Sequence, residues 1–138
     1  MRKVILNKCY GGFDVSYKAY QLYAKKKGLK LYMYKLEVTD NGNIYKKVKY
    51  KGFPFLEFFI KDFGDVALIS EEEYAKYNLF LDINDREDPI LIEVVEELGK
   101  DASGRFGNLV VVEIPDDLDY VIDEYDGIET LHQRTQEW

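Results

Sequence analysis

One short loop contains the residue types that could hold a negatively charged ligand. The apolar run Val4 to Leu6 is typical of a buried strand, and a helix is predicted to follow from Ser16. Between them, paired glycines let backbone N–H groups converge, a lysine adds a full positive charge, and the helix N-terminus adds a partial one. Aromatic residues beside the glycines offer a face on which a base can stack. The candidate ligand-binding residues of this loop are Lys8, Tyr10, Gly11, Gly12 and Phe13.

The same loop has a second interpretation. Glycine adopts backbone angles that other residues avoid, so paired glycines next to an aromatic residue are equally typical of a tight turn anchored in the core. Two cations of the acidic second half also have two interpretations. Arg105 lies in a glycine-rich loop, and Arg134 lies near the C-terminus. Each is either an ion-pair partner within the chain or a fork for a phosphate group. Both arginines join the loop as candidates for ligand binding.

Residues that form catalytic or metal sites are sparse. Cys9 is the only thiol and His132 the only imidazole, and they lie near opposite ends of the chain, so their pairing depends on the fold. The spacing from Asp82 to Glu93 imitates a calcium loop, but Arg86 stands at a ligand position and the required glycine is missing. Nucleotide-binding motifs of the GxxxxGK[ST] or GxGxxG type do not occur. We expect no catalytic residue, no metal site and no cofactor.

Length and composition predict a single domain over residues 1–138. The chain is 46% hydrophobic with twelve Tyr and eight Phe, which supplies enough apolar area to form a core without disulfides. One cysteine fits a reducing compartment. The apolar run near the N-terminus is too short for a signal peptide or a membrane span. The expectation is therefore a cytoplasmic protein without membrane contact.

Charge is distributed unevenly along the chain. Residues 1–61 carry fourteen Lys and Arg against four acids, whereas the remainder carries five basic and twenty-two acidic residues. In one interpretation the basic and acidic halves face each other, within the fold or between subunits; in the other, the basic half attracts a phosphate-bearing ligand. Extended nucleic acid is a poor partner in both, because the acidic half would repel a long polyanion.

The elements that must position these residues alternate in type. Two main helices are expected at about 16–27 and 89–99, the first capped by Ser16 or Asp14 and the second by Asp88 with Pro89 in its first turn. A shorter helix follows Ser70. We predict an α/β (α+β) fold with a mostly antiparallel sheet of about five to seven strands. The strands are expected at 4–6, 30–38, 44–50, 53–60, 66–69, 109–114 (apolar enough to be central) and 120–125, before a short helical tail at 128–138.

Three segments carry a resemblance when they are taken together. They are Asn7-Lys8-Cys9-Tyr10-Gly11-Gly12-Phe13 with its Ser-capped helix, Glu87-Asp88-Pro89-Ile90-Leu91-Ile92-Glu93-Val94-Val95, and Val112-Glu113-Ile114-Pro115-Asp116-Asp117 running into Glu124-Tyr125-Asp126-Gly127. Their combination resembles the phage type I Thoeris anti-defence family over roughly half of the chain.

This resemblance implies a sponge, a protein that sequesters the immune signal glycocyclic ADP-ribose made by a TIR-domain enzyme without cleaving it. Some members are implied to bind cyclic di- or trinucleotides at separate sites. The resemblance also implies a homo-oligomer, a dimer or a hexamer, in the host cytoplasm during infection. In the family the pockets lie between subunits, where an aromatic ring stacks on adenine and arginines contact the phosphates. No residue-by-residue alignment places these roles on this chain.

Two other functions remain open at this point. A phage protein rich in tyrosine and acidic residues could inhibit a host defence protein by direct contact. A phosphodiesterase or ligase-like enzyme would be revealed by metal-dependent turnover. Our first hypothesis is binding of a small anionic cyclic nucleotide across a subunit interface, with release of the ligand unchanged.

Overall fold

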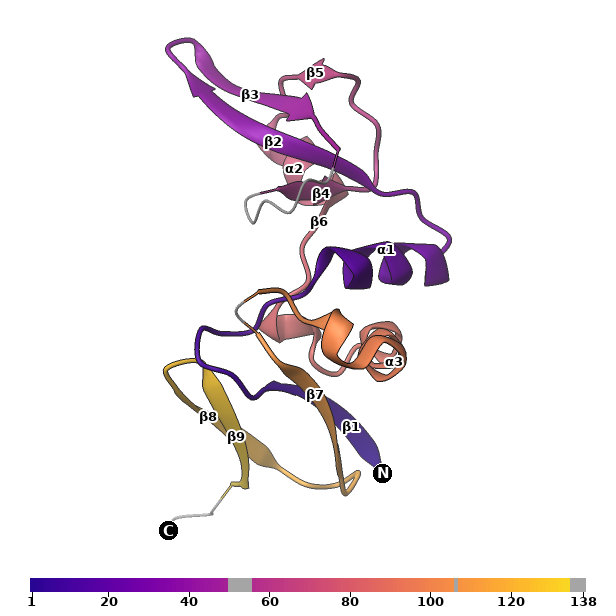
Figure 1. The fold of residues 1–138 in the computed structure, drawn as a ribbon, viewed down its shortest axis with the longest axis vertical. Coiled ribbons are helices and arrows are strands. Elements are labelled where there is room, and N and C mark those ends of the chain that lie inside the picture. The colour runs from indigo at the N-terminus through magenta and orange to yellow at the C-terminus, as the bar shows by residue number, and fades with distance from the viewer. Residues whose placement is uncertain (50–55, 106, 135–138) are drawn as a thin grey trace. The chain divides into compact units, whose positions relative to one another are not determined.

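The structure is a computed structural model that describes residues 1–49, 56–105 and 107–134. Its contacts divide the chain into two compact units, which Figure 1 shows along the colour gradient. Unit 1 comprises Met1–Lys27 and Leu81–Trp138, and unit 2 is the continuous segment Gly28–Phe80 inserted between them. The span for which we predicted one domain is thus built from two units, each described by itself below.

The predicted fold class is confirmed, because helices are combined with strands that pair only in the antiparallel sense in the described residues. The α-helices are α1 (Tyr17–Lys26), α2 (Glu71–Tyr77) and α3 (Pro89–Leu98). Two 3-10 turns, η1 (Ile83–Asp85) and η2 (Gly99–Ala102), precede and follow α3. The strands are β1 (Arg2–Asn7), β2 (Tyr32–Thr39), β3 (Gly42–Lys47), β4 (Glu57–Phe59), β5 (Val66–Ala67), β6 (Asn78–Leu79), β7 (Leu109–Ile114), β8 (Tyr120–Tyr125) and β9 (Ile128–Gln133).

The helices begin where their capping residues predict. The Ser16 hydroxyl accepts a hydrogen bond from the N–H of Ala19 at the start of α1. The Asp88 carboxylate accepts from the N–H groups of Ile90 and Leu91, with proline in the first turn of α3. Ser70 forms a full capping box at the start of α2. These contacts satisfy N–H groups that a helix end leaves without partners, and they depend only on nearby sequence.

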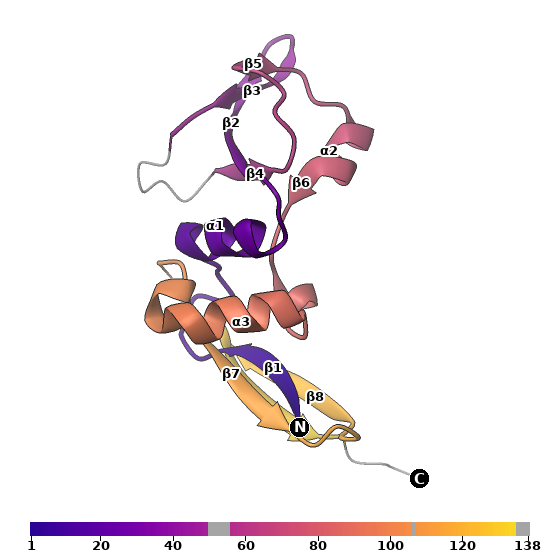
Figure 2. The same ribbon diagram turned by 90° about the vertical axis from the view of Figure 1, so that its right-hand side faces the viewer.

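Unit 1 is layered. Figure 2 shows α3 on one side of β1 and β7, with β8 on the other side of that pair, and α1 lies against α3. Strands β1 and β7 pair in the register Leu6↔Val110, and β8 pairs with β9 in the register Ile122↔Leu131. Because side chains alternate along a strand, β1 points Val4 and Leu6 toward the β8–β9 hairpin and Ile5 toward the other face. All three are buried.

The predicted helical tail is wrong for residues 128–133, which form strand β9. Asp126 and Gly127 both have positive φ angles, 48° and 92°, as a tight two-residue hairpin turn requires. The turn folds β9 back onto β8, and Leu131 then packs in the cluster around Val4 and Leu6. Residues 135–138 of the predicted tail lie outside the described residues.

Strand β7 was expected to be central, but in the described part of the chain it pairs with β1 alone. Its apolar sequence reflects packing on both faces. Val110, Val112 and Ile114 lie toward the β8–β9 hairpin, and α3 lies against the other face. A run that is apolar because both faces are covered cannot be distinguished by composition from one that has strands on both sides.

Unit 2 is a five-stranded antiparallel sheet in the order β5-β3-β2-β4-β6, with α2 in the same unit. The predicted hairpin around residues 39–43 is confirmed as β2 and β3. Its core is aromatic: Tyr34, Tyr45 and Phe59 are buried, and Phe59 meets Tyr34 and Tyr74 edge-on at ring-centroid distances of 5.6 Å. Such edge-to-face packing suits the quadrupoles of the rings. Residues 53–55 of the predicted strand 53–60 lie outside the described residues.

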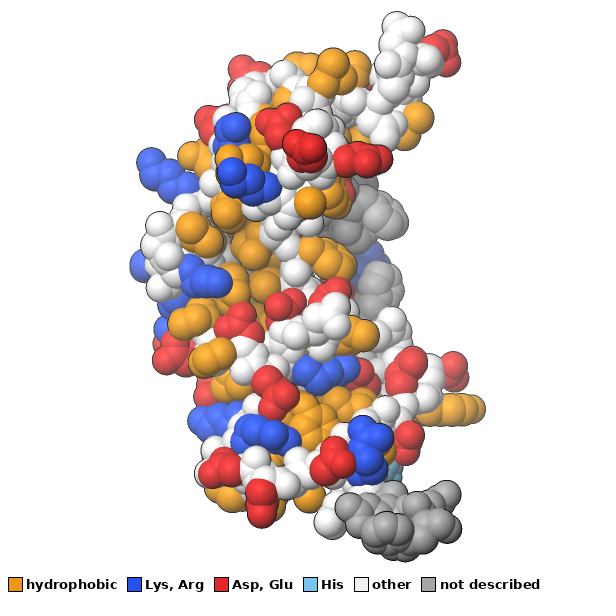
Figure 3. Space-filling model, turned by 180° about the vertical axis from the view of Figure 1, so that it is seen from behind, with side chains coloured by type: hydrophobic (Ala, Val, Ile, Leu, Met, Phe, Trp, Pro, Cys, Tyr) orange, Lys and Arg blue, Asp and Glu red, His pale blue; other side chains and the backbone are white. Residues whose placement is uncertain are grey.

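The basic and acidic halves of the chain pair with each other inside each unit. Acidic and basic side chains are interspersed over the face in Figure 3 rather than gathered by sign. Cations from residues 1–61 pair with carboxylates of the remaining chain in Met1–Asp116 (through the terminal amine), Arg2–Glu87, Lys3–Glu96, Lys18–Asp101, Lys26–Glu97, Lys47–Asp62 and Lys61–Glu73.

Candidate functional site

The end of β1 is held by a buried asparagine with a complete set of hydrogen bonds. Asn7 is 0% exposed. Its side-chain amide donates to the carbonyl oxygens of Gly127, at 2.6 Å, and Cys9, at 2.9 Å, and its side-chain oxygen accepts from the N–H of Asn108 at 2.8 Å. One side chain therefore joins the glycine loop after β1, the start of β7 and the β8–β9 turn.

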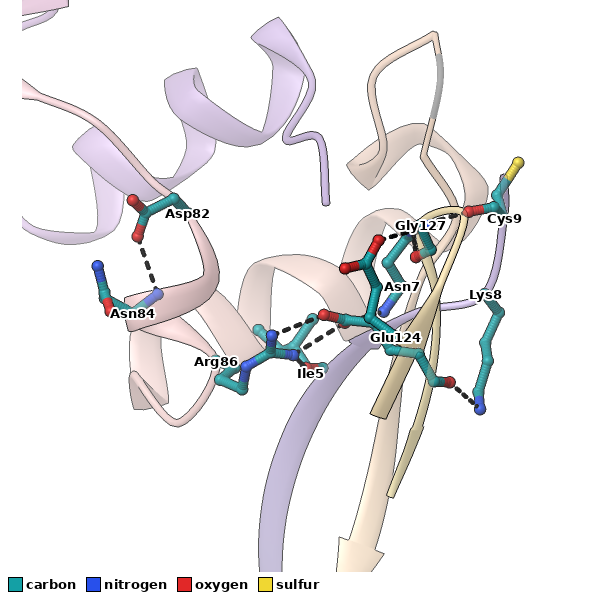
Figure 4. A network of polar contacts seen from close by, with 10 residues as sticks. Ile5, Asn7, Lys8, Cys9, Asp82, Asn84, Arg86, Glu124 and Gly127 are labelled. Carbon is teal, nitrogen blue, oxygen red and sulfur yellow. Dashed lines mark hydrogen bonds and ion pairs between the residues drawn. The ribbon is translucent and has the colours of Figure 1, made fainter. Parts of the chain in front are cut away.

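Arg86, which Figure 4 labels near this asparagine, forms a buried ion pair with Glu129. Arg86 donates from Nη1 and Nη2 to the two carboxylate oxygens of Glu129, at 2.9 and 2.7 Å. The carboxylate also accepts from the Asn7 N–H at 2.8 Å. Side-chain exposure is 14% for Arg86 and 7% for Glu129, so the two-pronged contact is shielded from water and from salt.

Arg86 also closes the outer edge of β1. Its backbone oxygen accepts from the Ile5 N–H at 2.8 Å, and its Nη1 donates to the Ile5 oxygen at 2.9 Å. The guanidinium lies 5.3 Å from the ring centroid of Phe13, within cation–π range. The cation that argued against a calcium loop thus fixes β1 and Phe13, while η1 before it is capped by Asp82.

The glycine loop packs against the hairpin turn. The Gly11 N–H donates to the Asp126 oxygen at 3.0 Å, and Gly11 and Gly12 have φ angles of 118° and 122°. A side-chain carbon on Gly127 would lie 2.5 Å from the Gly12 nitrogen, so the two turns approach as closely as glycine permits. We call the exposed residues of these turns the paired-turn surface: Tyr10, Gly11, Tyr125 and Asp126.

Gly104 packs against Asp14, at the end of the glycine loop. The Gly104 N–H donates to the Asp14 oxygen at 2.9 Å, and a side chain at Gly104 would collide with the Asp14 carboxylate. Arg105 follows this contact and is exposed, and it already interacts with another group of the protein. The fold therefore brings Arg105 to the same turn system as the glycine loop.

The candidate residues of the loop have unequal roles. Lys8 is exposed, and its Nζ donates to the Glu129 backbone oxygen at 2.6 Å, which leaves two of its three donors for other groups. Tyr10 is 63% exposed, whereas Phe13 is half-buried over the guanidinium. The cap of α1 is occupied by Ser16, which also donates to the Asp101 oxygen, so this helix end is joined to η2.

Arg134 lies apart from the loop within one chain. Its Nε contacts the Asp119 carboxylate at 3.1 Å, and its N–H donates to the Asp119 oxygen. This contact is at the end of the β8–β9 hairpin opposite the Asp126–Gly127 turn. Five strand steps separate the two ends, which is about 17 Å. The fold of one chain therefore does not bring Arg134 together with the candidate residues of the loop.

The fold does not bring together Cys9 and His132, the two residues considered for a nucleophile–base pair. Cys9 lies next to the Gly127 turn, whereas His132 contacts Asp123 farther along the hairpin. In the described part of the chain, no group of three or more His, Cys, Asp or Glu side chains could hold a metal ion. None of its helices has both the length and the apolarity needed to cross a membrane.

Sequence inspection missed four residues that matter here. The sequence predicts Asn7 only as the end of a strand, Glu129 only as part of the tail, and Arg86 only as an obstacle to a calcium loop. Tyr125 is 74% exposed on the outer face of the hairpin turn. The Asp126-Gly127 pair after Tyr125 is itself a hairpin signature, and it could have predicted the turn next to that ring.

Comparisons with protein-family models, curated proteins and solved structures find no match for this chain.

Proposed function

We propose that the protein binds a small nucleotide-like ligand on the paired-turn surface and releases it chemically unchanged. The observation that carries this proposal is the display of two exposed tyrosine rings, Tyr10 and Tyr125, on turns joined by the Gly11–Asp126 hydrogen bond. A tyrosine side chain has only two rotatable torsions, so it loses little entropy when a flat ligand stacks on its ring. Each stacked base contributes about 1–3 kcal/mol.

The charges around the rings constrain how such a ligand lies. Lys8 and Arg105 are cations near the glycine loop, whereas Glu124 and Asp126 are exposed carboxylates at the hairpin turn. Phosphate groups of the ligand therefore lie on the Lys8 and Arg105 side, and a neutral ring lies over the tyrosines. Arg134 contributes in this scheme from a second copy.

The resemblance described above supports the identity of the ligand class and the role. A phage type I Thoeris anti-defence sponge would use the site to sequester glycocyclic ADP-ribose, or a cyclic di- or trinucleotide, in the host cytoplasm. Sequestration needs tight binding without chemistry. We accordingly propose a homo-oligomeric binding protein and not an enzyme.

The first experiment measures binding and the fate of the ligand. Glycocyclic ADP-ribose is titrated calorimetrically into the protein, with linear ADP-ribose and a cyclic dinucleotide as comparisons. The complex is then heat-denatured and the ligand is analysed by chromatography. Stoichiometric binding with intact ligand supports the proposal, whereas an altered product or an absence of binding to every compound contradicts it.

The second experiment locates the site. Tyr10→Ala and Tyr125→Ala are each expected to weaken binding at least tenfold, while Phe80→Ala, which removes an equally exposed ring in unit 2, leaves it unchanged. Asp126→Asn keeps a residue that tolerates the positive φ and removes a negative charge, so it tightens anion binding about threefold. Cys9, the only thiol, becomes slower to alkylate when ligand is bound.

One observation favours a second function, inhibition of a host defence protein by direct contact. Unit 2 exposes Val38, Val66 and Leu68, and the last two line an open hollow of about 260 Å³ together with Ile44 and Ala67. Exposed apolar patches are typical of protein interfaces. Stoichiometric capture of one host protein that Leu68→Asp abolishes, without bound nucleotide, would favour this function.

A further inference from the structure

We propose that two copies of this chain pair through the outer edge of β7, forming a continuous four-stranded sheet β1-β7-β7-β1 about a two-fold axis at Val112. The inference does not depend on the ligand. The two edges of the β1–β7 pair differ in their hydrogen-bond partners. Arg86 occupies the outer edge of β1 through both bonds to Ile5, whereas β7 has no second strand in the part of the chain that is described.

The register shows which groups of β7 point outward. Because the N–H and C=O of Ile5 bond to Arg86, they point away from β7. Residues opposite each other in an antiparallel pair share this orientation, and it alternates along the strand. Val111 pairs with Ile5 and Glu113 pairs with Lys3, so the backbone groups of Val111 and Glu113 point outward.

The two ends of this edge limit how a strand can add. At one end, the outward N–H of Leu109 is already bonded to the Ser103 hydroxyl at 2.6 Å. At the other end, Pro115 has no N–H, and the chain turns away there through the Leu118 N–H bond to the Pro115 oxygen. The open edge is therefore the short stretch Val111–Glu113, where the outward N–H and C=O groups have no partner among the described residues and are a template for another strand.

A second copy fits this stretch in one antiparallel register. With Val112 opposite Val112 of the partner, Val111 lies opposite the partner's Glu113 in both directions, and four N–H···O=C bonds form. Leu109 then lies opposite the partner's Pro115, where neither residue has an outward N–H to offer. A contact that uses the same atoms of both copies closes on itself and stops at a dimer.

The side chains are compatible with the same register. Val112 lies opposite the partner's Val112, and Val110 lies opposite the partner's Ile114. These apolar pairs extend the face that carries the Val4 and Leu6 cluster. On the opposite face each Glu113 lies beside a valine and remains next to Lys3 of its own chain. No two like charges are directly opposite, which would weaken a sheet.

Disulfide trapping tests the register in the full chain. Directly opposite residues without mutual hydrogen bonds have Cα atoms about 4.5 Å apart, within reach of a disulfide. In a Cys9→Ser background, Val112→Cys is expected to form a disulfide-linked dimer on mild oxidation. Val110→Cys is the matched control and does not cross-link, because its partner position is Ile114.

A charge exchange tests the contact without trapping. Val111→Glu places a carboxylate opposite the partner's Glu113 twice, and Val111→Lys places an ammonium there, at the same half-buried position. We expect a dimer of twice 16.2 kDa by sedimentation, roughly tenfold weaker for Val111→Glu and no weaker for Val111→Lys. Glu113→Lys added to Val111→Glu restores the dimer.

The proposal is overturned if the unsubstituted chain sediments as a monomer and Val112→Cys fails to cross-link. It is equally overturned if an oligomer persists while Val110→Cys and Val112→Cys cross-link alike, since assembly would then use another face. Circular dichroism of each variant separates loss of pairing from loss of fold. Ligand binding is measured separately, so failure of the paired-turn surface would leave this interface standing, and the reverse.

Discussion

Arg86 and Glu129 form a contact that stabilises the fold only when both charges are present. Each charge has lost most of its water, and their attraction and shared hydrogen bonds offset that cost. Removing one partner leaves the other buried and uncompensated, so the pair is more sensitive to substitution than the exposed ion pairs of the surface.

Glu129→Gln should therefore lower the free energy of unfolding by about 3 kcal/mol. Urea denaturation monitored by circular dichroism measures the change. Glu93→Gln removes a carboxylate that faces Lys26 in the open and serves as the control, with an expected loss below about 1 kcal/mol. Equal losses in the two variants would mean that the buried pair is not specially shielded.

The same carboxylate makes stability depend on pH. Burial raises the pKa of Glu129, but the hydrogen bonds from Arg86 and the Asn7 N–H outweigh it and hold the pKa below the ordinary 4.5. As pH falls, the unfolded chain takes up this proton first. The stabilisation is complete above about pH 4.5 and is lost as pH falls through the folded pKa. Glu129→Gln should reduce the decrease in the free energy of unfolding between pH 7 and pH 3, measured by urea denaturation at each pH.

Asp85 behaves in the opposite way. Burial, together with the charges of Asp82 and Asp88, raises its pKa above the ordinary 3.8. Its charged form is therefore disfavoured in the folded protein, and stability falls as pH rises through that pKa. Asp85→Asn, which keeps an oxygen for the Asp82 N–H, should raise the melting temperature at pH 7 and lose the advantage near pH 3. A lower melting temperature at pH 7 would contradict this.

Residues of this kind lie beyond what the sequence can predict. Ser16 and Asp88 were predicted as caps because their partners are two or three positions away. Asn7, in contrast, bonds to Gly127 across 120 positions, and Glu129 meets Arg86 across 43. No local pattern identifies which of twenty-six acids will be buried. The loop glycines and the Asp126-Gly127 hairpin could each be predicted as a turn, but not the packing of one against the other.

At the scale of elements, the Asp126–Gly127 turn determines that the segment after it is a strand. The spacing of apolar residues in 128–133 is compatible with a helix, yet the hairpin gives β9 a partner, and the cluster around Leu6 covers its inner face. The prediction of a helix failed because pairing with a neighbouring strand outweighs local preference.

Gly127→Ala tests how tightly this turn is packed. Gly127 combines a φ of 92° with a 2.5 Å approach of any side-chain carbon to the Gly12 nitrogen. Gly42 has a φ of 117° in the other hairpin but nothing within 4 Å. Backbone strain alone costs about 1–2 kcal/mol, so Gly42→Ala gives that loss and Gly127→Ala a clearly larger one. Chemical denaturation compares them, and equal losses would show that the turns are not in close contact.

At the scale of the whole molecule, the uneven distribution of charge along the chain is resolved by pairing. The basic first half and the acidic second half meet within each unit, as the Lys3–Glu96 and Lys47–Asp62 contacts illustrate. This agrees with the first of the two interpretations of the sequence. The cations that remain available to a ligand are correspondingly few, which is why the proposal relies on ring stacking.

The two units have separate cores, and substitutions should act on one of them at a time. Phe59→Ala opens the aromatic core of unit 2, at an expected cost of about 3–5 kcal/mol. Hydrogen exchange followed by mass spectrometry should show lost protection in β2 and β3 with β1 and β7 little changed. Leu91→Ala, in the buried stripe of α3, should give the converse. Uniform loss from either variant would indicate a single cooperative unit.

The insertion of Gly28–Phe80 has a consequence for how the chain is made. During synthesis β1 leaves the ribosome first, yet its partner β7 is translated about a hundred residues later, after the whole of unit 2. The described strands of the inserted segment pair with one another, so this segment can fold before β1 has its partner strand. The nascent protein must therefore keep an apolar strand soluble until β7 appears, and the lysines and arginine that border Val4–Leu6 are well placed to do so.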